Sequence, residues 1–277
     1  MQTDNILFKN FLYIIRSGAF DDSRPISMMS PFKWGKMVQL AQLHGLIPIL
    51  AKGLEHYFYD VNFNIPPSQI ETIRERLKSN PIKGFSELYD FDHLHLQNKT
   101  LNQRLQQIIK AEYADTERSF ETMQTLAILL VNVEHILTGK SYLKGIIDLG
   151  RYLRVEGSKV DFVKLENWLK STEMTKMGDY QCRLLISGFG FSKEEFPFMQ
   201  KNPGDDLEAV LLAVSPDSLK QFKPWDFHES KGGFVIGSPL RTLRSIRHTL
   251  TYRRYAPREA FSTIYQGFLK GLSEIEE

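Results

Sequence analysis

The feature that most constrains the fold is a run from Phe85 to Leu137 that contains neither proline nor glycine. Apolar residues recur in it at roughly heptad spacing, which favours a long helix packed lengthwise on another helix: Phe91, Leu94, Leu101, Leu105 and Ile108. A single helix over the whole run would be roughly 80 Å long. We therefore expect a break near AEYADTE, with Asp115 as the cap of the second half, and a long helix or helical hairpin over residues 81–138.

Helix start and stop signals also occur on both sides of this run. Ser30 and Pro31 are typical of the first positions of a helix, and Gly45 is typical of its end. Pro67 opens another predicted helix. The segment ILFKNFLYIIRSG predicts a first amphipathic helix rather than a signal peptide, because Lys9 and Arg16 interrupt its apolar run.

These patterns predict an all-α fold: a multi-helix body with one long helical hairpin and at most a short extended pair near residues 232–237. We divide the chain into an N-terminal helical lobe (1–80), the long helix or hairpin (81–138) and a C-terminal helical lobe (139–277). The three parts are expected to form one continuous body.

Charge and cysteine content exclude some classes of function. The 35 lysines and arginines nearly balance the 33 acidic residues, so the net charge of +2 creates no strong field for nucleic acid or an anionic membrane. The single cysteine, Cys182, excludes an intramolecular disulfide framework and favours the cytoplasm. No apolar run is long enough to span a bilayer, so no membrane partner is expected.

The segment SYLKGIIDLGRYLRVEGSKVDFVKL contains the residue types with which nucleotidyltransferases hold a nucleoside triphosphate. Helical spacing places one apolar face beside a stripe of charges that includes Lys144 and Asp148. Gly157 then ends the helix in a left-handed conformation, and Asp161 caps the next one. A catalytic Asp-x-Asp pair is missing, because Lys159 and Val163 stand two residues from Asp161. A structural role is therefore favoured.

The chain also resembles a known family. Four segments are similar to helical parts that flank the catalytic core of uncharacterised bacterial nucleotidyltransferases: WGKMVQLAQLHGLIPIL, LVNVEHIL, LKGIIDLGRYLRVEGSKVDFVKLENWLKSTEM and GGFVIG. The resemblance implies a core between NQRLQQIIK and SFETMQTL, where this chain has only AEYADTER. It thus implies a shortened relative that lacks the nucleotide-binding half, and it transfers no catalytic residue.

The only Asp-x-Asp of the chain lies in SELYDFDHLHLQNK. Asp90 and Asp92 would converge on a metal ion if the segment were a strand, whereas on a helix only Asp92 and His95 would meet. The helical pattern around the segment favours the second arrangement. We predict no metal site here, and these three residues are the weak candidates for one.

The C-terminal segment KGGFVIGSPLRTLRSIRHTLTYRRYAPREAF contains the strongest charge pattern. A glycine-rich lead into a helix that starts at Pro239 offers backbone N–H groups to an anion, and basic residues follow. The candidate anion-binding residues are Arg241, Arg244, Arg247, His248, Arg253 and Arg254. Tyr252 and Tyr255 are interleaved with them and favour base stacking. The alternative is a solvated basic face that pairs with acidic neighbours.

Three hypotheses from different classes follow. The first is a non-catalytic, nucleotidyltransferase-derived helical protein that binds a partner protein or a small anionic ligand without a cofactor. The second is an active nucleotidyltransferase with a rearranged metal and nucleoside triphosphate site, which would require Mg²⁺. The third is a nucleic-acid or phosphate-binding module that uses the arginine-rich helix, and the near-neutral net charge does not favour it. The missing carboxylate pair favours the first hypothesis.

Overall fold

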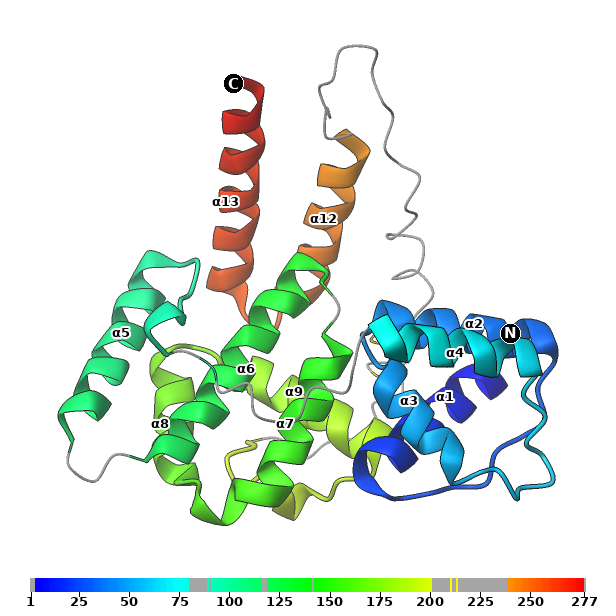
Figure 1. The fold of residues 1–277 in the computed structure, drawn as a ribbon. Coiled ribbons are helices and arrows are strands. Elements are labelled where there is room, and N and C mark those ends of the chain that lie inside the picture. Colours follow the sequence, from blue (N-terminus) through cyan, green and yellow to red (C-terminus); the bar gives the residue numbers. More distant parts are fainter. Residues whose placement is uncertain are drawn as a thin grey trace.

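The computed structural model describes residues 3–79, 89, 91–115, 119–140, 142–200, 210, 213 and 239–276. These residues form eleven α-helices and no strand (Figure 1). The all-α prediction is therefore confirmed. The short extended pair expected near residues 232–237 lies outside the described residues.

The N-terminal lobe consists of four helices, α1 (Thr3–Phe20), α2 (Pro31–Leu43), α3 (Ile47–Glu55) and α4 (Pro67–Ser79). Helix α2 begins as predicted: the Ser30 side chain accepts a hydrogen bond from the Lys33 backbone N–H at 3.4 Å, and Pro31 occupies the first helical position. Helix α4 also begins at the predicted Pro67. Local capping signals therefore fix the starts of both helices.

Helices α1 and α3 cross where their backbones touch. A Cβ atom added at Gly18 would lie 2.0 Å from the Ile49 carbonyl oxygen, and one added at Gly53 would lie 2.0 Å from that of Ile14. A backbone atom cannot rotate away as a side chain can, so only glycine fits at either position. The two glycines set the closest contact of the lobe.

The body of the molecule is built around α6 (Phe120–Thr138), which packs against α7 (Leu143–Glu156), α8 (Phe162–Ser171) and α9 (Thr175–Phe189) (Figure 1). Helix α6 is buried on nearly every side, including the polar Asn132. Asn132 donates through Nδ2 to Gln181 Oε1 at 2.9 Å, and Gln181 donates to the Leu129 carbonyl at 3.0 Å. These bonds fix the register of α6 and α9, since buried polar groups are costly when left unpaired.

The helix predicted from Phe91 onward begins only at Lys99 as α5 (Lys99–Ala114). Residues 91–93 form a 3-10 turn, η1 (Phe91–His93), and the Asn98 side chain caps α5 by accepting from the Leu101 N–H at 3.1 Å. The predicted role of Asp115 is also wrong. It follows the last turn of α5, and Ser119 precedes α6. The expected break near AEYADTE is present, because α5 and α6 are separate helices.

Segment 141–165 folds into two helices, as its spacing indicates. The predicted inner face of α7 is buried: Leu143, Ile146, Ile147, Gly150 and Leu153. Lys144 and Asp148 form the expected ion pair at 2.7 Å.

The structure confirms the predicted role of Asp161 in this segment and contradicts that of Gly157. Asp161 caps α8 by accepting from the Lys164 N–H at 2.9 Å, as predicted. Gly157 is not left-handed: its φ is −59°, and the chain continues into a 3-10 turn, η2 (Gly157–Lys159). The segment therefore forms two structural helices, and Asp161 is the N-cap of the second, α8.

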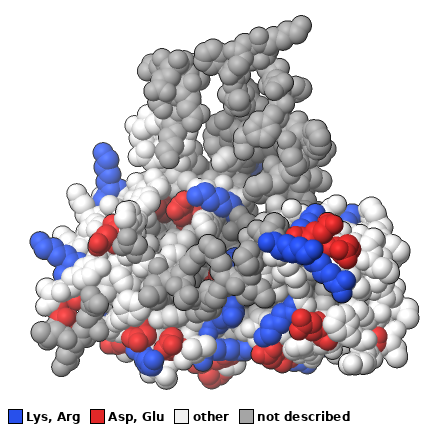
Figure 2. All heavy atoms as spheres, viewed as in Figure 1, with Lys and Arg blue, Asp and Glu red and all other residues white. Residues whose placement is uncertain are grey.

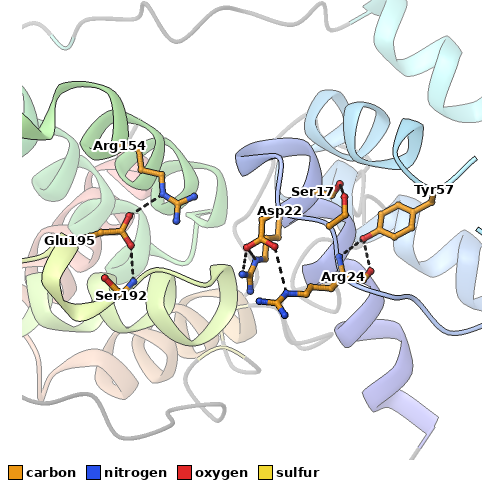
Figure 3. A network of polar contacts seen from close by, with 9 residues as sticks. Ser17, Asp22, Arg24, Tyr57, Arg154, Ser192 and Glu195 are labelled. Atoms are coloured by element: carbon orange, nitrogen blue, oxygen red, sulfur yellow. Dashed lines mark hydrogen bonds and ion pairs between the residues drawn. The ribbon is translucent and has the colours of Figure 1, made fainter.

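A polar and aromatic joint connects the N-terminal lobe to the body (Figure 3). The Arg154 guanidinium of α7 lies 3.8 Å from the ring centre of Phe191 and 5.0 Å from that of Phe20, at the end of α1. Arg154 also donates to Glu195 at 3.0 Å, and Glu195 accepts from the Ser192 N–H at 2.7 Å. Because Arg154 contacts a ring from each part, it packs the lobe against the body.

Two C-terminal helices, α12 (Pro239–Tyr252) and α13 (Pro257–Glu276), lie side by side and project from the body (Figure 1). Their bases contact α6, whereas the C-terminal end of α13 points away from it. Within the described part of the chain, no helix combines the length and the apolar character that crossing a membrane requires.

Candidate functional site

The α12–α13 pair is here called the hairpin, and it is distinct from the helical hairpin predicted over residues 81–138. It is anchored to the end of α6. The last carbonyl groups of a helix have no partner within that helix. Thr249 donates its hydroxyl to the Leu137 carbonyl at 2.8 Å, and His248 Nε2 lies 2.8 Å from the Ile136 carbonyl. Burial lowers the pKa of His248, so the imidazole is neutral and donates through Nε2. Two side chains of α12 thus donate hydrogen bonds to two of the carbonyl groups that lack a partner at the end of α6.

Buried tyrosines form the base of the hairpin. The Tyr142 hydroxyl lies 3.1 Å from that of Tyr252 and 3.5 Å from that of Tyr180. The ring of Tyr255 lies 4.6 Å from that of Tyr180. Burial raises the pKa of Tyr142 and Tyr180 well above the ordinary value, so these hydroxyls stay protonated. The cluster joins α7, α9 and α12 into one packed unit.

Glu259, in the first turn of α13, ties the hairpin to α5. Its Oε1 accepts from the Gln97 N–H at 2.5 Å and its Oε2 from the Asn98 N–H at 3.0 Å, while Asn98 Nδ2 donates to Ser262 at 3.0 Å. These N–H groups stand at the N-terminus of α5, where a carboxylate is favourable. Burial raises the pKa of Glu259, and the two accepted hydrogen bonds oppose that rise. The base of α13 is therefore held from a second side.

An ion-pair cluster adds a third connection. Glu173, between α8 and α9, accepts from Arg258 at 2.8 Å and from Arg104 of α5 at 3.3 Å. All three side chains are partly exposed, so these pairs contribute orientation more than stability. The first turns of α13 are thus fixed in direction relative to the body.

Beyond its base, α13 exposes an apolar stripe. Phe261, Tyr265, Phe268 and Leu269 are 58, 61, 54 and 40% exposed. Tyr265 follows Phe261 by four residues, and Phe268 and Leu269 follow Tyr265 by three and four, so the four side chains share one side of the helix. A Cβ atom added at Gly267 would meet no atom within 4 Å, so the flank of the helix is also open at this position. We call these four residues the α13 stripe. The sequence reasoning missed it, although the spacing of its aromatic residues was a usable signal.

The structure separates the predicted anion-binding residues into three groups. Arg247, Arg253 and Arg254 are exposed, whereas the side chains of Arg241 and Arg244 lie outside what the structure describes. Arg254 packs against its neighbour: its guanidinium lies 4.7 Å from the ring centre of Tyr255 and donates to the hydroxyl of that residue at 2.6 Å. Three of the six predicted residues are thus exposed, at the end of α12 and in the turn after it.

One of the predicted anion-binding residues, His248, and the two tyrosines interleaved with the set are turned inward. His248 binds the Ile136 carbonyl rather than projecting to solvent. Tyr252 and Tyr255 are 2% and 7% exposed, so their rings do not support the base stacking that would favour the nucleic-acid hypothesis. Their aromatic area is used for packing because the base of the hairpin has to cover α6 and α9. On the face shown in Figure 2, residues of both charges are interspersed over the body.

The weak metal candidates are not assembled into a site by the described residues. Asp92 lies within the turn η1 and His95 two residues after it; both are exposed, and Asp90 lies outside the described residues. His95 Nδ1 lies 3.1 Å from the His93 carbonyl. In the described part of the chain, no group of three or more His, Cys, Asp or Glu side chains is placed to hold a metal ion.

Comparisons of the chain with models of protein families, with curated proteins and with solved structures find no match. The resemblance to nucleotidyltransferases therefore stays a prediction. The structural features that bear on function are the anchored base of the hairpin and the α13 stripe.

Proposed function

We propose that the chain is a non-catalytic helical protein that binds a partner protein through the α13 stripe. The main support for this proposal is that Phe261, Tyr265 and Phe268 are each more than half exposed on one side of one helix. Single exposed apolar residues are ordinary, but a contiguous set is typical of an interaction surface. Aromatic residues are also enriched at the centres of protein interfaces.

The anchoring of the hairpin supports this proposal. Glu259, Thr249 and Arg258 hold the base of α13 and its neighbour at three places on the body. A helix that is already formed and oriented loses less conformational entropy on binding than a disordered segment. The stripe is thus presented by a rigid support, as effective binding sites require.

The proposal keeps the family descent that the sequence resemblance implies. It assigns no residue to catalysis and needs no cofactor. Arg247 and Arg253 are exposed near the base of α12 and offer a salt-dependent contact to an acidic partner surface. We assign them a role in steering the partner.

Site-specific photo-crosslinking tests the proposal. Tyr265 is replaced by p-benzoylphenylalanine in the native host, and the same residue is placed at Val155, which is 70% exposed on α7, as a control. We expect discrete protein adducts at position 265 at a yield about tenfold above that of the control, since Val155 lies outside the proposed binding surface. An equal yield at both positions, or no adduct at position 265, contradicts the proposal.

A further inference from the structure

We propose that the partner is a second copy of this chain, and that the two α13 helices pair antiparallel along their stripes. This inference rests on the proposed function and specifies its partner. It follows from the spacing of the apolar residues and from the distribution of charge along α13.

The apolar spacing is that of a helix-pairing seam. Continuing the stripe along α13 gives apolar residues separated by four, three, four and three positions: Phe261, Tyr265, Phe268, Leu272 and Ile275. This is the heptad spacing with which one helix packs lengthwise on another. Within the described part of the chain, the first three of these residues are each more than half exposed. A seam of this kind fits a helix that carries the same spacing, and a second α13 carries it by definition.

The charges select the direction of pairing. The start of α13 and the turn before it contribute Arg253, Arg254 and Arg258, whereas the sequence ends in Glu274, Glu276 and Glu277. Antiparallel pairing places the acidic end of each helix beside the basic start of the other, and it also opposes the helix dipoles. Parallel pairing would place like charges together at both ends. The two-fold axis makes each favourable contact occur twice.

The seam also fixes the register. In an antiparallel pair, the two types of heptad position face each other across the axis, so position 265 lies opposite position 268 of the second copy and position 261 opposite position 272. The axis then passes near Gly267, where the flank of the helix is open. Position 258 then lies opposite position 275 of the second copy, which stands between two glutamates in the sequence. The interface is confined to one helix of each copy, so we expect a dimer that dissociates on dilution through the micromolar range.

Sedimentation velocity of the full chain over a range of concentrations tests the inference. We expect a monomer–dimer equilibrium for the unaltered chain and for Val163→Asp, a control at an exposed valine of α8. Phe268→Asp should be monomeric at every concentration, with an unchanged circular dichroism spectrum, because the Phe268 side chain is 54% exposed. A dimer that persists in Phe268→Asp overturns the inference.

Charge reversal and disulfide formation test the direction. Glu274→Lys with Glu276→Lys should raise the dimer dissociation constant about tenfold, and adding Arg253→Glu should restore part of the loss. Phe261→Cys mixed with Leu272→Cys should form a mixed disulfide dimer, whereas Phe261→Cys alone should not. The native Cys182 is buried and does not compete. A disulfide dimer from Phe261→Cys alone shows parallel pairing and contradicts the proposed direction.

The inference and the proposed function can fail separately. If the chain is monomeric at all concentrations while position 265 crosslinks to another protein, the self-pairing is wrong and the proposed function stands. If the chain is monomeric and position 265 gives no adduct, both are wrong. An adduct with twice the mass of the chain supports both.

Discussion

Helices α6 and α13 are of similar length, 19 and 20 residues, and both carry long apolar sets, but their surroundings are opposite. Helix α6 is covered by α7, α8, α9 and α12, and even its polar Asn132 is fully buried. Helix α13 packs on α12 and, at its base, on α6, and the α13 stripe faces outward. An apolar helix face shows that a partner is needed, but it does not show whether the partner lies in the same chain.

The largest expected effect comes from one leucine truncation made in each helix. Leu129→Ala in α6 removes a side chain that is 1% exposed, and it should lower the free energy of unfolding by about 3 kcal/mol. Leu269→Ala in α13 removes one that is 40% exposed, and it should change that free energy by less than about 1 kcal/mol. Urea denaturation followed by circular dichroism measures both. Equal losses would mean that the stripe is packed within its own chain in solution.

Replacing one glycine of α7 and one of α13 by alanine should give the next largest difference in stability. A Cβ atom at Gly145 of α7 would lie 1.9 Å from Asn132 Oδ1, so Gly145→Ala must displace Asn132 from Gln181 and should cost about 2 kcal/mol. Gly267→Ala on α13 meets no atom and should instead stabilise the helix by up to about 1 kcal/mol. Thermal unfolding should therefore shift in opposite directions for the two variants. If both variants shifted the unfolding temperature in the same direction, the contrast between the buried body and the exposed α13 would be contradicted.

The smallest expected effect is a pH dependence at the base of α13. Burial raises the pKa of Glu259 above its ordinary value of 4.5, so the folded chain binds this proton more tightly than the unfolded chain. Its contribution to stability is therefore full below pH 4.5 and decreases as the pH rises through the folded pKa. The stability difference between the unaltered chain and Glu259→Gln should fall over that interval and stay constant above it. A difference that grows with pH would show that the two backbone hydrogen bonds outweigh burial.

Much of the fold was predictable because it depends on neighbours in sequence. Ser30 and Asp161 cap their helices with N–H groups only three residues away. The ion pair of Lys144 and Asp148 and the buried face of α7 follow from helical spacing in the same way. The late start of α5 was missed because Asn98 ends a segment whose apolar spacing continues through a 3-10 turn. Periodicity alone does not distinguish that turn from a helix.

The candidate site was less predictable because it depends on distant parts of the chain. Tyr252 and Tyr255 carry the same residue type whether they face solvent or a buried cluster, and only their contact with Tyr180 of α9 decides the matter. The role of Glu259 requires the N–H groups of Gln97 and Asn98, which lie more than 160 residues away in sequence. No local pattern indicates such a pairing.

The sequence by itself determined that the chain is helical, where several helices begin and which residues form their apolar faces, since these properties depend on residues within about one turn of each other. Only the tertiary structure decided which apolar faces are covered. The covering of α6 and the exposure of the α13 stripe result from how distant helices pack, and burial is a property of the whole assembly of helices.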